Sequence, residues 1–184
     1  ALAVTLVAAA GGASMAGADT EENRRFVVGA ARDLLGREPS AGEVNGWTAR
    51  LGAGRPRSEI TRAMSYSPEW NGEVVDGLFD SVLGRPADST GRRFWVERLL
   101  QGASPAGLAV ALATSSESLG RGDGSGAATA GILYEALLGR PADGGGQGHF
   151  GAQIDGGANL ASVALALYSS AESRARRVEA LYVR

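Results

Sequence analysis

Few side chains in this 184-residue chain are of the types on which catalysis and metal binding usually depend. The chain has one histidine, His149, and no cysteine. Any histidine-based triad or histidine-ligated metal site would have to use His149, and thiol catalysis, disulfides and thiolate metal sites are excluded. The positions around His149 recur elsewhere in the chain without a histidine, so we expect a partly exposed helix residue rather than a catalytic one.

Carboxylates offer the remaining route to catalysis. A pair of acidic side chains can supply the general acid and base of glycoside cleavage, and the candidates are Asp76, Asp80, Glu97 and Glu117. Their separations cannot be read from the sequence. An exported glycoside hydrolase, or an accessory domain of a cell-wall enzyme, is therefore kept as the alternative hypothesis.

Short motifs that suggest ligand binding have simpler explanations. Arg121-Gly122-Asp123 spells a cell-adhesion tripeptide, which arises easily by chance in a chain rich in arginine and glycine. Asp88 and Asp143 each follow Gly-Arg-Pro-Ala, in turns where calcium could bind in a secreted protein, but helix capping explains them more simply. We predict no catalytic, cofactor-binding or metal-binding residues.

A repeat organises the elements that would position such residues. Leu-Gly-Arg occurs three times, an aromatic residue stands eleven positions after each of its glycines, and a glutamate stands twenty-two positions after each aromatic. The three sets are Gly36, Trp47 and Glu69; Gly84, Trp95 and Glu117; and Gly139, Phe150 and Glu172. A fixed period of this kind indicates a tandem array of supersecondary units.

The first helix of the repeat is clearest between Pro68 and Leu83. Its apolar residues from Val74 onward form one amphipathic stripe. Ser67 can cap its start, with Pro68 in the first turn, and Gly84 can end it in the left-handed conformation.

Two further helices complete each repeat. The second is capped by Ser40 (with Glu43 in a capping box) or Asp88 and carries the recurring aromatic. The third begins after Ser58, Ser104 or Asn159 and buries two apolar residues one turn apart, which are Ile60 and Met64, Leu108 and Leu112, or Val163 and Leu167. No segment alternates strongly enough to predict a strand. The predicted fold is all-α, with tandem three-helix repeats of about 48 residues packed as a small helical array.

The arginine of each Leu-Gly-Arg recurs at a fixed distance from the later glutamate, in the pairs Arg37 and Glu69, Arg85 and Glu117, and Arg140 and Glu172. These residues could line a repeated polar groove that binds a partner. Alternatively, each arginine pairs with its glutamate across a helix junction, and the fixed register favours this structural interpretation.

The chain divides into six predicted segments. Residues 1–18 combine an apolar run with the small residues Ala16-Gly17-Ala18, which is typical of a secretory signal peptide cleaved after Ala18, here without its positive n-region. Helical repeats 1, 2 and 3 are predicted at residues 19–70, 71–118 and 127–173, with a Gly-rich linker at 119–126 and the start of a truncated fourth repeat at 174–184. Because of this linker, we expect repeats 2 and 3 to pack less tightly together than repeats 1 and 2.

The repeat pattern resembles a widespread bacterial domain of unknown function that occurs in tandem on secreted proteins and is itself similar in pattern to phycobilisome linker domains. The shared pattern is Leu-Gly-Arg-Pro-x-Asp, an aromatic, a glycine and Ser-x-Glu, and it is clearest from Val74 to Glu117, in VVDGLFDSVLGRPAD and FWVERLLQG. The resemblance implies a helical, extracellular, interaction-mediating module without an established activity.

The sequence thus favours an exported, non-catalytic module for protein–protein or cell-surface interaction. Its partner would be another extracellular protein, cell-wall material or further copies of the same repeat. The formal net charge of −2 gives no field that would favour nucleic acid. We expect no cofactor, no nucleic-acid partner and no stable membrane insertion after signal cleavage.

Overall fold

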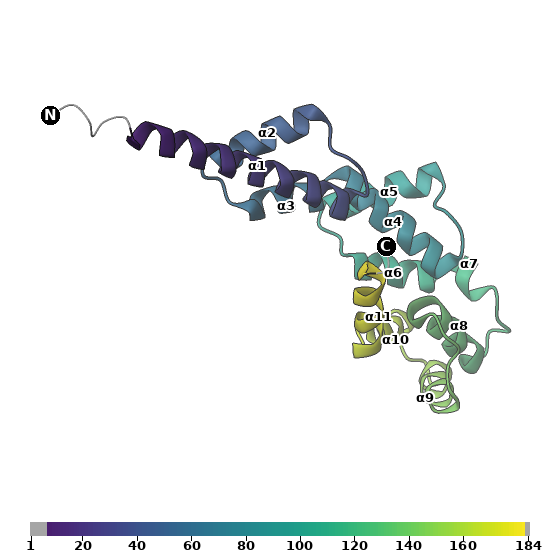
Figure 1. Cartoon of the computed structure of the whole chain (residues 1–184). Coiled ribbons are helices and arrows are strands. Elements are labelled where there is room, and N and C mark those ends of the chain that lie inside the picture. The colour runs from purple at the N-terminus through teal and green to yellow at the C-terminus, as the bar shows by residue number, and fades with distance from the viewer. Residues whose placement is uncertain (1–6, 183–184) are drawn as a thin grey trace. The chain divides into compact units, whose positions relative to one another are not determined.

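The computed structural model describes the backbone of residues 7–182 and the side chains of residues 19–179. All regular secondary structure in this part of the chain is helical, which confirms the predicted all-α fold (Figure 1). The helices are α1 (Val7–Leu35), α2 (Ala41–Gly52), α3 (Arg57–Ser65), α4 (Pro68–Leu83), α5 (Ser89–Leu100), α6 (Pro105–Ala113), α7 (Ser116–Leu119), α8 (Gly126–Leu138), α9 (Gly144–Asp155), α10 (Leu160–Tyr168) and α11 (Ala171–Tyr182).

The chain forms two compact units that divide between Trp70 and Asn71. In the first unit, residues 1–70, α2 and α3 both pack against α1. Its core contains Val27, Ala31, Val44, Leu51, Ile60 and Met64, with Trp47 and Trp70 packed against it.

The second unit, residues 71–184, has one continuous core drawn from repeats 2 and 3. The helices α6, α8 and α10 contact one another, and α8 also packs along α9. Buried members of this core include Val75, Phe79, Leu99, Leu108, Leu112, Leu133, Val163 and Leu167. The expected loosening between repeats 2 and 3 is therefore wrong.

The inserted segment does not separate repeats 2 and 3 into two domains. It lies between two helices, since α7 ends at Leu119 and α8 begins at Gly126 with Ser125 as its cap. The Nη2 of Arg121 donates a 2.7 Å hydrogen bond to the carbonyl of Leu83 at the end of α4, which ties the insert to repeat 2.

The helix-stop role of Leu-Gly-Arg is confirmed. The backbone φ angles of Gly36, Gly84 and Gly139 are 64°, 70° and 62°, so each glycine is in the left-handed region that ends a helix. A side chain at these positions would strain the turn.

Most of the predicted caps are present. Ser40 and Glu43 form the capping box, and the side chains of Ser104 and Asn159 accept backbone N–H groups at the starts of α6 and α10. The prediction for α3 is wrong by two residues, because Pro56 precedes the helix without a side-chain cap and Ser58 lies inside the first turn. The fixed φ of proline suits this entry, so no polar cap is needed.

The predicted signal peptide is only partly described. Residues 1–6 lie outside the described residues, and residues 7–18 form the first turns of α1. Residues 183–184 of the predicted fourth repeat also lie outside, while α11 covers the rest of that repeat up to Tyr182. Cleavage after Ala18 stays a prediction.

Candidate functional site

The recurring arginines and glutamates form three ion pairs of the same geometry. The Nε and Nη2 of Arg85 donate to the two carboxylate oxygens of Glu117 at 2.5 and 2.7 Å. Arg140 binds Glu172 in the same two-point manner, at 2.5 and 2.9 Å. Each pair joins the end of one repeat's first helix to the residues that follow its third helix, so the structural interpretation of these residues is confirmed.

The first pair has an additional member. Arg37 donates Nε and Nη2 to Glu69, and its Nη1 and Nη2 also reach the carboxylate of Glu43 at 3.1 and 2.8 Å. The hydrogen bond from Arg37, with further bonds from Ser40, holds the pKa of Glu43 at about 2, well below its usual value of 4.5. The same guanidinium lowers the pKa of Glu69.

Repeats 2 and 3 use an aromatic ring where repeat 1 uses Glu43. Arg85 lies over the ring of Phe79, and Arg140 lies over the ring of Tyr134. Both rings approach a glycine of the next helix, Gly91 or Gly146, where an added Cβ would contact the ring. In repeat 1 the register places the small Ala31 at the aromatic position and Glu43 at the glycine position. The arginine therefore has a second partner in every repeat. In repeats 2 and 3 this partner is an aromatic ring of α4 or α8, and in repeat 1 it is Glu43 of α2.

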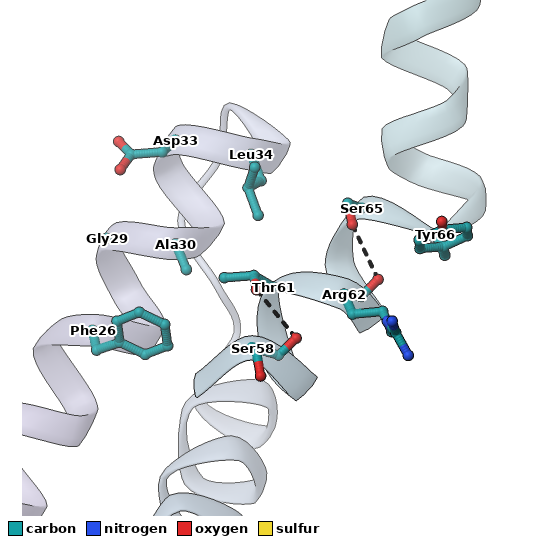
Figure 2. Close-up of a pocket in the computed structure, with 10 residues that line it drawn as sticks. All are labelled: Phe26, Gly29, Ala30, Asp33, Leu34, Ser58, Thr61, Arg62, Ser65 and Tyr66. Atoms are coloured by element: carbon teal, nitrogen blue, oxygen red, sulfur yellow. Dashed lines mark hydrogen bonds between the residues drawn. The ribbon is translucent and has the colours of Figure 1, made fainter. Parts of the chain in front are cut away.

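A groove of about 600 Å³ runs between α1 and α3 in the first unit (Figure 2). Both helices line it with residues spaced i, i+3, i+4, i+7 and i+8, which is one helix face. From α1 these are Phe26, Gly29, Ala30, Asp33 and Leu34. From α3 and its C-cap they are Ser58, Thr61, Arg62, Ser65 and Tyr66.

The hydroxyl groups of Thr61 and Ser65 in this groove are already satisfied. Thr61 Oγ1 donates to the carbonyl of Ser58 and Ser65 Oγ donates to the carbonyl of Arg62, both at 3.2 Å (Figure 2). Because these hydrogen bonds lie within α3, covering Thr61 and Ser65 with an apolar surface would leave no donor unpaired. The hydroxyl groups of Thr61 and Ser65 thus add little polar cost when the groove is covered.

Two charged residues at the groove are free to interact. Asp33 on α1 and Arg62 on α3 are both exposed, and neither has an ion-pair partner among residues 19–179. Arg57, next to the groove, lies 4.8 Å from the ring centroid of Phe26 and donates to Glu22 at 2.6 Å. Arg57 is therefore held by internal contacts, whereas Asp33 and Arg62 are not.

The residues that the sequence offered for ligand chemistry have structural roles. His149 is exposed on α9, 2.8 Å from Gln153, and its ring packs edge-on against Phe150. Within the Arg-Gly-Asp motif, Arg121 is held by the Leu83 carbonyl, and Asp123 accepts hydrogen bonds from the backbone N–H and hydroxyl of Ser125. The tripeptide is thus used for local turn geometry.

Asp88 and Asp143 act as helix caps. Asp88 accepts from two backbone N–H groups at the start of α5, and Asp143 accepts from Gly146 N at 2.7 Å. These backbone hydrogen bonds lower the pKa of both carboxyls. Over the side chains that the structure describes, no group of three or more His, Cys, Asp or Glu is placed to hold a metal ion.

The four carboxylates of the alternative hypothesis do not form one site around the groove. Asp76 pairs with Arg92 at 2.8 Å, and Glu117 belongs to the Arg85 pair, whose hydrogen bond lowers the pKa of Glu117. Asp80 and Glu97 are exposed on α4 and α5. None of the four lines the groove between α1 and α3. A general acid at neutral pH needs a raised pKa, which Glu117 lacks.

The fold and these contacts define the chain as an all-helical tandem-repeat protein with one arginine–glutamate pair inside each repeat. The chain belongs to the family described as a domain of unknown function (DUF4214), whose model matches residues 71–121 and again residues 124–177. No curated protein and no solved structure matched the chain. Residues 19–70 share the helix stop, the aromatic and the arginine–glutamate pair with the two matched repeats.

The groove itself was missed by sequence reasoning. Its α3 side is mostly polar, and a polar stripe on a helix usually marks a solvated face. The available signal was the comparison between repeats, because the positions equivalent to Thr61 in repeats 2 and 3 are the alanines Ala109 and Ala164.

Among the helices described, none is both long and apolar enough to cross a bilayer.

Proposed function

We propose that this chain is an exported, non-catalytic interaction module whose binding surface is the groove between α1 and α3. The observation that carries the proposal is that this groove combines satisfied hydroxyls and an apolar floor with two unpaired charges, Asp33 and Arg62. A partner that supplies the opposite charges can desolvate such a surface, and these charges can select that partner.

Three further features support the proposal. The conspicuous polar residues of the repeats are engaged in holding helices together, as in the Arg85–Glu117 pair. The resemblance of the repeat pattern to phycobilisome linker domains implies an interaction-mediating module. The signal-peptide pattern of residues 1–18 supports export, and N-terminal sequencing of chain recovered from the medium of producing cells should begin at Asp19.

A capture experiment tests the interaction role. Biotinylated wild-type chain would be incubated with secreted proteins and cell-wall material, in parallel with a Thr61→Arg variant that fills the groove. Asn45→Arg, which adds the same charge to an exposed site on α2, is the matched control. We expect wild type and Asn45→Arg to retain the same partner and Thr61→Arg to lose it. Equal capture by all three chains would contradict a binding role for the groove.

The hydrolase hypothesis has its own test. Purified chain would be incubated with cell-wall polysaccharide, and release of reducing ends would be measured for wild type and for Asp80→Asn and Glu97→Gln variants. We expect no release from any of these chains. Hydrolysis that disappears in one carboxylate variant would overturn the non-catalytic proposal.

A further inference from the structure

We propose that the groove between α1 and α3 pairs with the same groove of a second copy of this chain, which gives a two-fold symmetric dimer. The inference rests on the proposed function, because it names the partner of the same surface. The argument begins with how repeats 2 and 3 contact each other inside one chain.

Part of the face that is equivalent to this groove lies in the core that repeats 2 and 3 share. The repeat register aligns Thr61 with Ala109 of α6 and Ala164 of α10, and it aligns Ser65 with Ala113 and Tyr168. The helices α6 and α10 pack directly against each other, and all three alanines are fully buried in the core common to these helices. The third helices of two repeats thus associate through a contact that includes these three alanines.

In repeat 1 the equivalent side chains are also small, but they are not buried. Thr61 and Ser65 are only half-buried, and they are among the smaller residues that could replace alanine there. Their hydroxyls bond back to α3, so they present little unpaired polar surface to a neighbour. Leu34 is also half-buried, whereas its equivalents Val82 and Leu137 are buried in the second unit.

Charge selects a second copy of repeat 1 over another repeat. Asp33 and Arg62 stand at positions that are uncharged in repeats 2 and 3. In a two-fold contact residue i meets residue j twice, so each Asp33 would face the partner copy's Arg62. Two opposite charges would then pair across the interface, which no repeat lacking both residues could reproduce.

An aromatic side chain adds an anchor to this contact. Tyr66 is 71% exposed, and its equivalents in the other repeats are Thr114 and Ser169. Tyrosine is enriched among the interface residues that contribute most to binding. The large exposed ring therefore distinguishes the face of repeat 1 from those of repeats 2 and 3.

Charge reversal tests the pairing. The molar mass of the full chain would be measured by light scattering over a dilution series, and wild type should approach twice the 18.7 kDa monomer mass at high concentration. Arg62→Asp alone and Asp33→Arg alone should each raise the dimer dissociation constant about tenfold or more, because like charges then face each other twice. The double variant, and an equimolar mixture of the two single variants, should restore the dimer. Arg93→Asp, at an exposed site on α5, should leave it unchanged.

Labelling of a single thiol separates failure of this inference from failure of the proposed function. The chain has no cysteine, so Thr61→Cys places one thiol in the groove. A monomer whose thiol reacts rapidly with maleimide would overturn the self-pairing and leave the groove open to a foreign partner. A monomer whose thiol is protected would overturn both, because the chain itself would cover the groove. A dimer that ignores both charge reversals would overturn the self-pairing by showing that copies meet through another surface.

Discussion

Replacing Arg37, which pairs with Glu43 and Glu69, should destabilise the first compact unit measurably but modestly. Arg37 makes four hydrogen bonds to Glu43 and Glu69, and the side chains of all three residues are 38% exposed. Ion pairs with this much solvent contact contribute up to about 1 kcal/mol each. Arg37→Met removes two such pairs and leaves two carboxylates facing each other, so we expect a loss of about 1–2 kcal/mol in the free energy of unfolding. Glu69→Gln removes one pair and keeps its shape, and it should cost about 0.5–1 kcal/mol.

The assay is urea unfolding of the whole chain followed by tryptophan fluorescence. Trp47 and Trp70 report on the first unit, and a Trp95→Phe background removes the signal of the second. Glu38→Gln is the matched control, because Glu38 pairs with Arg32 where their side chains are 66% and 60% exposed, and it should change the midpoint little. A loss above about 3 kcal/mol for Arg37→Met would refute the reasoning, since it would indicate a buried cluster that is costly to break. Equal shifts of the urea midpoint for Glu38→Gln and Glu69→Gln would also refute the reasoning.

Three other perturbations have expected outcomes. The folded-state pKa of Glu43, about 2, is below its usual 4.5, so its stabilisation is complete above about pH 4.5 and is lost as the pH falls toward 2; urea midpoints over this range should fall more in wild type than in Glu43→Gln, where Glu69 with its lowered pKa still titrates. Gly77→Ala should gain about 0.5–1 kcal/mol because nothing lies near an added Cβ, whereas Gly151→Ala should lose about 1–3 kcal/mol because its Cβ would lie 3.0 Å from Ala127 N; thermal melts in which both variants shift the same way would contradict this. Ser104→Ala removes the cap of α6 and should cost about 1 kcal/mol in chemical unfolding, and an unchanged midpoint would mean that tertiary contacts alone hold this helix end.

The predictable parts of this structure depend on short-range chemistry. The helix stop at Gly84 and the caps at Asp88 and Ser104 were predicted because each requires only a particular residue type and its neighbours. The Arg85–Glu117 pair was also predicted, since a spacing that recurs in every repeat implies a recurring contact. The start of α3 was misplaced because Ser58 satisfies the local rule for a cap although the helix does not use it.

The contacts that could not be predicted depend on which helix faces are covered. Nothing local indicates that Arg121 reaches back to the Leu83 carbonyl, because the contact requires the insert to fold against α4. The same limit applies to the groove, whose Thr61 and Ser65 have the composition of a solvated helix face.

The sequence by itself determined the all-α fold, the helix stops and most of the caps, because caps, glycine stops and apolar periodicity act within a few residues of each other. The tertiary structure decided that repeats 2 and 3 share one core and that the equivalent face of repeat 1 is open. The physical reason is that burial of a helix face is a property of its neighbours. Ala109 and Thr61 occupy the same position in their repeats, and the packing of α8 and α10 against α6 makes the first a core residue while the second lines a groove.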